Sequence, residues 1–242
     1  MSTHSPSADG LVPSAPSSGI ADLTEMISRA LPSAHARTHR RLAETARRRL
    51  TAAGEIIVWQ GEPTPLTLVV RGHTAFRRTT PDGRQLVLGL ATRGDMFGLT
   101  SIAAQRARFD LVAINGAEVA VWPAGGLRAM AAADPGLAID VIDGMARDVV
   151  DITERLDGFI HQDARRRVVR ILTRYRDLFF ERPAVLSRAH LPSMVGTSRE
   201  MTGRVLRDLE REGMVIRVGR AGLRLLAPAR LEEAARSITD DA

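Results

Sequence analysis

Short apolar runs alternate with glycines along the first half of the chain, between residues 54 and 121. Runs of this length, separated by turn residues at this spacing, are typical of the strands of a β-sandwich or β-roll. Pro81-Asp82-Gly83 has the composition of a hairpin turn, because glycine supplies the positive φ that such turns need. We therefore predict an all-β domain with strands at residues 55–59, 66–70, 86–90 and 111–114.

A different pattern starts at Pro135, where apolar residues recur at alternating steps of three and four. This heptad repeat predicts a long helix with an apolar seam, which is buried best against a second copy of itself. The alternative is a helix that packs on its own β-domain. We favour a homodimer, with an interface formed by Ile142, Met145, Val149, Ile152, Leu156 and Phe159.

The last third of the chain predicts a winged helix-turn-helix. The helical phase breaks at residues 161–163, and a second amphipathic pattern follows. Residues 191–212 then carry two helical patterns separated by Gly196, and two apolar runs flank the turn at residues 219–222. Three helices followed by a hairpin make up this motif.

The second helix of this motif is the best candidate for a functional site. Thr197 and Glu200 have the spacing of a capping box, which predicts that the helix begins there. One face would pack on the preceding helix through Thr202, Val205, Leu206 and Leu209. The other face is either a solvated charged surface or a DNA-reading surface, since Arg donates twice to guanine and Glu accepts from the cytosine amine. Its position in the motif favours DNA reading by Ser198, Arg199, Glu200, Gly203, Arg204 and Arg207.

Composition narrows the choice of partner and compartment. The formal net charge of +6 favours a polyanion such as nucleic acid. No apolar stretch is long enough for a membrane helix, and the first residues lack the pattern of a secretory signal. Cysteine is absent, which excludes disulfides, thiol catalysis and thiolate metal sites. We expect a cytoplasmic protein with no membrane partner.

The segment from Val195 to Leu206 resembles the recognition helix of the cyclic AMP receptor protein and fumarate-nitrate reduction regulator (CRP/FNR) family. It has a glycine turn, then Ser-Arg-Glu at residues 198–200, and a second arginine one turn later. The resemblance extends from Gly54 to Leu226, because the glycines of the β-domain, including the run Gly94–Gly98, follow the family's order and spacing. It implies that Arg199, Glu200 and Arg204 read bases in a palindrome with half-sites close to TGTGA.

The resemblance also implies the fold class, the domains and the function. The fold is expected to be α+β: a β-roll (a double-stranded β-helix like cyclic nucleotide-binding domains), a long dimerisation helix and a C-terminal winged helix-turn-helix. We expect a disordered extension at 1–20, the β-roll sensor at 21–134, the dimerisation helix at 135–161 and the DNA-binding domain at 162–242. The implied function is a homodimeric transcription regulator, not an enzyme, whose partners are double-stranded DNA and RNA polymerase.

The effector pocket departs from the family pattern. The members that bind cyclic nucleotides have a glutamate where this chain has Leu99, and their phosphate-binding arginine falls on Ala107. One step along a strand reverses the face, so the neighbouring arginines would point the other way. We expect that cyclic AMP is not a tight ligand, and that another anion or no effector is used. The candidate pocket residues are Gly98, Leu99, Thr100, Arg106 and Arg108.

Two smaller points concern cofactors and the first helix of the motif. The family's iron and haem ligands have no counterpart near residues 94–100, and His73 has no second histidine near it, so neither a metal, a haem nor an iron-sulfur cluster is expected. Pro192 stands where the family has Ala or Gly in the first helix of the motif. Because Pro is tolerated in a first helical turn, we expect this helix to begin one turn late, which affects its phosphate contacts but not the reading helix. The competing functions are a cupin-like enzyme and a β-roll signalling module without sequence-specific DNA binding.

Overall fold

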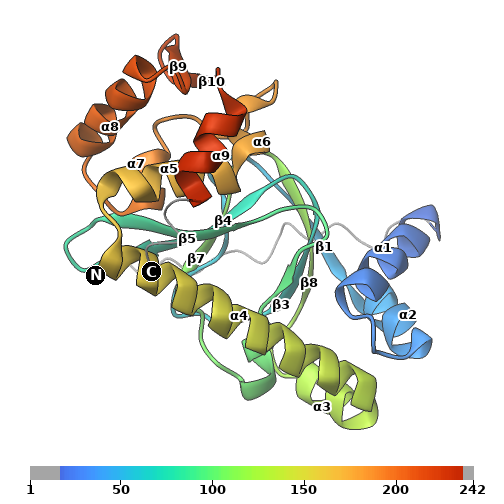
Figure 1. Ribbon diagram of the computed structural model, residues 1–242. Helices are drawn as coiled ribbons and strands as arrows, with labels where there is room; N and C mark the ends of the chain where they lie inside the picture. The colour runs from blue at the N-terminus through green and yellow to red at the C-terminus, as the bar shows by residue number, and fades with distance from the viewer. Residues whose placement is uncertain (1–16, 237–242) are drawn as a thin grey trace, which may run out of the picture. The chain divides into compact units, whose positions relative to one another are not determined.

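The computed structural model describes residues 17–236, except for the side chains of residues 17, 18, 157 and 159–161. The chain forms two compact units (Figure 1). The first unit comprises the residues up to Arg78 together with Gly89–Val149, and the second comprises Thr79–Leu88 and the residues from Val150 on. No helix within residues 17–236 combines the length and the apolar character needed to cross a membrane.

Two four-stranded antiparallel sheets form the β-roll, which confirms the predicted fold class. One sheet has the order β1 (Arg47–Thr51), β8 (Ala117–Trp122), β3 (Leu66–Arg71) and β6 (Met96–Phe97). The other has the order β2 (Ile56–Val58), β7 (Asp110–Ala113), β4 (Thr74–Thr79) and β5 (Gln85–Ala91). A short 3-10 helix, η1 (Leu99–Ala103), follows β6.

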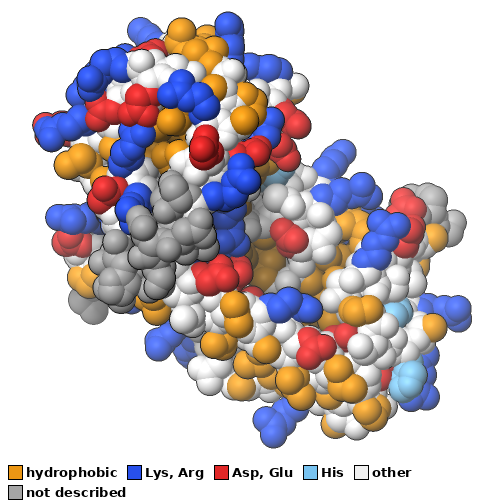
Figure 2. All heavy atoms as spheres, viewed as in Figure 1, with side chains coloured by type: hydrophobic (Ala, Val, Ile, Leu, Met, Phe, Trp, Pro, Cys, Tyr) orange, Lys and Arg blue, Asp and Glu red, His pale blue; other side chains and the backbone are white. Residues whose placement is uncertain are grey.

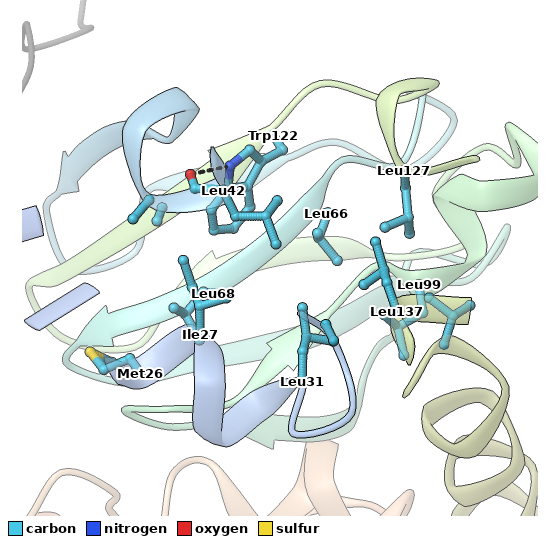
Figure 3. Close-up of a cluster of buried hydrophobic side chains, with 14 of the residues drawn as sticks. Met26, Ile27, Leu31, Leu42, Leu66, Leu68, Leu99, Trp122, Leu127 and Leu137 are labelled. Carbon is cyan, nitrogen blue, oxygen red and sulfur yellow. Dashed lines mark hydrogen bonds between the residues drawn. The ribbon is translucent and has the colours of Figure 1, made fainter. Parts of the chain in front are cut away.

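The main hydrophobic core of the first unit lies between helices and the outer face of β3 (Figure 3). Leu66 and Leu68 alternate with Thr67 along β3, so both leucines point to this side of the sheet. Trp122 joins the cluster from β8, and its indole N–H donates a hydrogen bond to the carbonyl of Leu42 at 2.9 Å.

Two helices precede the first strand, and the sequence analysis did not predict them: α1 (Ser17–Ala30) and α2 (Ala36–Thr45). Residues 17–20, expected to be disordered, are therefore helical, and the first strand begins at Arg47, ahead of the first predicted strand at residues 55–59. The helix forms because Leu23, Met26 and Ile27 share one face and are buried in the core. Residues 1–16 of the expected extension lie outside the described part of the chain.

Two buried aspartates fasten the N-terminal helices to the junction of α3 (Gly126–Ala133) and α4 (Pro135–His161). Asp134 accepts hydrogen bonds from the amide of His35 at 2.9 Å and the hydroxyl of Thr38, at the start of α2. Its other oxygen accepts from the amides of Gly136 and Leu137 in the first turn of α4. One carboxylate thus caps two helices.

Asp140 completes this attachment. Its carboxylate accepts from the amides of Ser33 and Ala34 at 2.9 to 3.1 Å, in the turn between α1 and α2. The turn lies so close to α4 that a Cβ at Gly136 would overlap with the carbonyl oxygen of Ser33. Glycine at this position therefore permits the contact.

The second unit contains the predicted winged helix-turn-helix. Its elements are α5 (Ala164–Arg174), α6 (Arg176–Phe180), α7 (Leu191–Val195), α8 (Arg199–Arg211), the hairpin of β9 (Val215–Val218) and β10 (Gly222–Leu225), and α9 (Pro228–Arg236). Its buried residues include Val168, Leu172, Phe179, Leu191 and Leu209. The β4–β5 tip joins this unit at the end of α4, where the Arg155 guanidinium donates to the carbonyl of Leu88.

Candidate nucleic-acid interface

The turn between α7 and α8 sets the direction of the candidate reading helix. Gly196 ends α7 with φ 68°, in the left-handed region that favours glycine. Its amide donates to the carbonyl of Pro192, which lies in the first turn of α7. Proline is tolerated there because the first amides of a helix have no intrahelical acceptor.

The predicted capping box is wrong by one residue. Ser198, not Thr197, is the N-cap of α8, and its hydroxyl oxygen accepts a hydrogen bond from the amide of Met201 at 3.1 Å. The Thr197 amide donates instead to the carbonyl of Pro192, so it is not available to Glu200. Both residues are of types that cap helices, and the geometry of the preceding turn decides between them.

The faces of α8 lie as the sequence pattern predicts. Its buried residues are Thr202, Val205, Leu206 and Leu209. Arg199, Glu200, Arg204 and Arg207 are exposed, and Gly203 between them is half-buried. A Cβ at Gly203 would meet only the end of the Arg207 side chain, at 3.8 Å. The glycine therefore leaves the surface of the helix without a side chain between Glu200 and Arg204.

The charges on this face are only loosely engaged within the protein. The guanidinium of Arg204 lies 3.7 Å from the carboxylate of Glu200, and 59% and 83% of the two side chains are exposed. Arg199 and Arg207 make no ion pair with any described residue. An exposed pair of this kind contributes little to stability, so a ligand can engage its members at small cost.

The hairpin adds basic residues that the sequence analysis missed. Arg188 donates from its backbone to the carbonyl of Ala221 at 2.9 Å, and from its side chain to the carbonyls of Gly219 and Arg220. This fixes the turn at whose tip Arg220 is exposed, and Arg224 is exposed on β10. The basic residues on either side of the turn were the signal that could have identified them.

An ion pair holds the hairpin to α8. Arg217 donates to Glu210 through its amide at 3.1 Å and its side chain at 2.8 Å. The amide hydrogen bond, followed by the guanidinium, keeps the pKa of Glu210 below its usual value. Figure 2 shows blue and red side chains interleaved over this unit.

The apolar seam of α4 is exposed in the single chain. The exposed fractions of its large side chains are 65% for Ile142, 63% for Val149, 56% for Ile152 and 55% for Leu156. Met145 is half-buried against the core, and the Phe159 side chain lies outside the described residues. The helix contacts its own domain with a different face, which carries Leu137 and Val141. In Figure 2 hydrophobic side chains gather along α4.

The candidate effector residues are not assembled into a polar pocket. Gly98 has φ 84°, and a Cβ there would overlap with the carbonyl oxygen of Pro65. Leu99 is buried in the main core beside Leu137 (Figure 3), whereas Thr100 is exposed.

The two arginines considered as replacements for the phosphate ligand point outward. Arg106 and Arg108 are exposed on either side of the buried Ala107. The Arg106 guanidinium donates to the carbonyl of Gly61 at 2.7 Å. Ala107 belongs to the cluster inside the roll.

Aromatic side chains fill the interior of the roll around Ala107. The ring of Phe76 packs edge-on against Phe97, with centroids 5.0 Å apart, and against Phe109 at 4.9 Å. Leu111 pairs with Phe76 across β4 and β7 and is buried on the same side. Such edge-to-face contacts are a favourable packing of aromatic rings.

No group of three or more metal-ligating side chains occurs among the described residues. His73 is the histidine of the roll, and its Nδ1 is buried without a hydrogen-bond partner in the described part of the chain. A lone imidazole of this kind does not provide the ligand set of a zinc or iron site.

Two family models match the chain. The model of the cyclic nucleotide-binding domain matches residues 48–134, and the model of the Crp-like helix-turn-helix domain matches residues 166–234. The first match covers the strands of the roll with η1 and α3, and the second covers α5 to β10 and most of α9.

Named relatives share most of their length with the chain. The cyclic AMP receptor protein of Thermus thermophilus is 30% identical over 190 residues, which are 78% of this chain and 88% of the relative. The cAMP-activated global transcriptional regulator Vfr of Pseudomonas aeruginosa is 28% identical over 189 residues, 72% of this chain and 86% of the relative. The structure of a CRP family transcriptional regulator from Thermus thermophilus has a TM-score of 0.65 and 26% identity, over 78% of this chain and 96% of that one.

Proposed function

Since the chain belongs to the CRP/FNR family of transcription regulators, we propose that a homodimer of it binds a palindromic DNA site with half-sites close to TGTGA. The helix that reads each half-site is α8. The family is one of DNA-binding regulators and not of enzymes.

The exposed face of α8 is the observation that carries this proposal. Arg199 and Arg204 are solvent-accessible near the capped N-terminus of the helix, and Glu200 lies between them. A recognition helix contacts base edges with its N-terminal residues. Two guanidinium groups can each donate twice to a guanine, and the carboxylate can accept from a cytosine amine.

The apolar seam of α4 supports the homodimer and therefore the palindrome. Four large aliphatic side chains on one stripe are more than half exposed, which is costly unless a partner covers them. A two-fold symmetric dimer presents two copies of α8, so its site repeats the half-site in inverted orientation.

The roll supports a departure from cyclic AMP control. The names of the two relatives connect them with cyclic AMP. In this chain Leu99 is buried in an apolar core, and the arginines beside Ala107 are exposed. We propose that cyclic AMP does not regulate this protein.

Selection of binding sites from random duplexes tests the proposal directly. We expect the selected sequences to contain inverted TGTGA-like half-sites, and mobility shifts to show tighter binding to the full palindrome than to one half-site. A scrambled duplex of equal length measures the non-specific component. Recovery of no common sequence would instead favour a β-roll signalling module without sequence-specific DNA binding.

The transcriptional partner requires a separate measurement. We propose that the bound dimer contacts RNA polymerase, as expected for a regulator that activates. Transcription in vitro from templates with the palindrome moved in steps along the promoter would show activation at some positions and repression at others. A protein that binds the palindrome and leaves transcription unchanged at every position would contradict this part.

A further inference from the structure

The contact between η1 and α4 joins the roll directly to the helix that carries the dimer seam. Leu99 is 8% exposed, and its Cδ1 fills the space beside Gly144 so closely that a Cβ at Gly144 would overlap with it. Leu137 and Val141 lie on the same side of α4 and belong to the same core. Leu99 therefore fits into a notch that exists because residue 144 is glycine.

This contact comes where the buried face of α4 ends. Leu137, Val141 and Gly144 are buried, but no described side chain from Ala146 to Leu156 is buried. Ile142 is next to the notch and points to the exposed seam. The Leu99 contact thus determines how the first half of α4, and with it the start of the seam, is oriented on the roll.

The described side chains that line the roll interior are aromatic and aliphatic. Phe76 contacts Phe97 and Phe109 there, and Ala107 is buried beside them. Arg77, next to Phe76 on β4, lies on the opposite face of the sheet and is paired with Asp110 at 3.2 Å, so it supplies no charge to the interior. An anion inside the roll would have to be neutralised, because a buried unpaired charge is very unfavourable.

The buried hydroxyls near this region are neutral. Thr67 on β3 and Ser101 on η1 are buried, and their hydroxyl oxygens have no partner among the described atoms. Thr67 is paired with Phe97 across β3 and β6, so it lies on the side of the sheet that faces the aromatic rings. A hydroxyl can satisfy a neutral polar atom, but it cannot neutralise a phosphate.

We infer that DNA binding by this protein needs no small-molecule effector, because the Leu99 side chain itself fixes η1 against α4. The inference rests on the proposed function and specifies its regulation. Leu99 acts as a positioning residue, since its effect on DNA reaches α8 only through α4 and the dimer. Control of target genes would then depend on the amount of protein.

The test compares DNA affinity of the dialysed wild-type protein with that of Leu99→Ala. We expect the wild type to bind the palindrome without additives and Leu99→Ala to bind about tenfold more weakly or worse. A tenfold loss corresponds to a binding-competent fraction of about one tenth, because the apparent affinity scales with that fraction. Leu23→Ala is the matched control, since Leu23 is buried in the same core but on α1. It should lose comparable stability and keep the DNA affinity of the folded protein.

A second variant covers the case in which Leu99→Ala does not fold. Gly144→Ala adds a methyl group to the notch from the α4 side and should also weaken DNA binding. The double variant should bind no more weakly than Leu99→Ala alone, because the smaller side chain removes the overlap. This non-additivity would identify the contact itself as the source of the effect.

The outcomes separate the inference from the proposed function. Unchanged DNA affinity in both single variants overturns the inference. Binding by the dialysed wild type only after addition of a cellular small-molecule fraction also overturns it, while the proposed function stands. A wild-type dimer that binds no duplex with or without that fraction refutes the proposed function, and the inference falls with it.

Discussion

A small charged group on α8 contributes little to the stability of the fold and is available to a ligand. It consists of Arg199, Glu200 and Arg204. The Arg204 to Glu200 distance of 3.7 Å and their high exposure make this ion pair weak. By contrast, Arg217 and Glu210 make two hydrogen bonds that hold the hairpin. Side chains of the same types thus differ in role according to their partners.

The first prediction concerns these arginines. Arg199→Ala and Arg204→Ala should each weaken binding to the palindrome by about 1 to 3 kcal/mol and relax the preference at one guanine per half-site. Arg211→Ala is the control on the same helix, because Arg211 lies at its C-terminal end and is paired with Asp208. Binding-site selection with each variant provides the measurement. Identical sequence preferences in wild type and both variants would remove α8 from the reading role.

Arg220 should behave differently from the base-reading arginines. It is exposed at the tip of the hairpin, on a turn that Arg188 holds in place. If it contacts a phosphate, Arg220→Ala should weaken binding to all duplexes alike. It should also reduce the slope of log binding constant against log salt concentration by about one unit. Titrations at several salt concentrations, with Arg199→Ala as the comparison, measure this. A loss confined to one sequence would contradict the phosphate role.

Asp134 makes the stability of the first unit depend on pH. Burial alone would raise its pKa, but hydrogen bonds from Thr38, His35 and Leu137 outweigh this and lower the pKa from 3.8 to about 2. The charged form therefore stabilises the fold above pH 4, and its contribution of about 2 kcal/mol is lost as the pH falls toward 2. Urea unfolding between pH 5 and pH 2.5 should show a steeper decline for the wild type than for Asp134→Asn. Asp143→Asn, at an exposed position on α4, should decline like the wild type.

At the scale of elements, α4 has two faces with different partners. Leu137 and Val141 contact the roll, and the stripe from Ile142 to Leu156 is left to solvent in the single chain. Packing on its own domain therefore accounts for one face of the helix, and the proposed dimer seam concerns the other face.

The dimer prediction uses this difference. Val149→Asp combined with Leu156→Asp should yield monomers that no longer bind the full palindrome, since charges within an apolar seam are unfavourable. Val150→Asp is the matched control, because Val150 is 57% exposed but lies off the seam. Sedimentation gives the mass of each variant. An intact dimer in the double variant would place the interface elsewhere.

Elements with a regular pattern were predictable, and elements held by distant contacts were not. The buried face of α8 follows from the helical period, as Val205 and Leu209 show. The strand β1 was not predicted, because Arg47, Arg48 and Arg49 give it no alternation of apolar and polar residues. It forms by pairing with β8, and the Arg48 guanidinium pairs with Glu118 on that strand. Such a cross-strand pair is invisible to a local pattern.

The candidate site was predictable to a similar extent. The exposed residues of α8 follow from the motif, but the contribution of Arg188 depends on a contact with a turn about thirty residues away. The burial of Leu99 against Gly144 is likewise a tertiary contact. The sequence indicated what Leu99 lacks, and the structure shows what it contacts.

For the whole molecule, the distribution of polar groups decides which ligands it can take. The exposed arginines of α8 are available to bases, and Arg220 on the hairpin is available to a phosphate. The roll interior, by contrast, is lined by Phe76, Phe97 and Ala107. The net charge of +6 is consistent with the proposed attraction to DNA.

Calorimetry with cyclic AMP tests, on the intact protein, the proposal that this nucleotide is not a regulator. We expect no binding in the micromolar range and no change in DNA affinity, since each unpaired polar group of the ligand costs about 1 to 3 kcal/mol and a charged one more. Low-micromolar binding that tightens DNA binding would contradict the expectation. In that case Arg108→Ala should abolish the effect, because a bulge would have turned Arg108 inward.

The double cap at Asp134 imposes an order on folding during synthesis. The amides of His35 and Ala34 precede the carboxylates of Asp134 and Asp140, to which they donate, by 99 and 106 residues. A nascent chain therefore carries α1 and α2 without their attachment until the start of α4 has left the ribosome. At about 5 to 20 residues per second, this wait is on the order of 5 to 20 seconds. During this wait the first two helices can pack only on parts of the core that are made earlier, such as Leu66 and Leu68 on β3, and they lack the hydrogen bonds that fix them to α4.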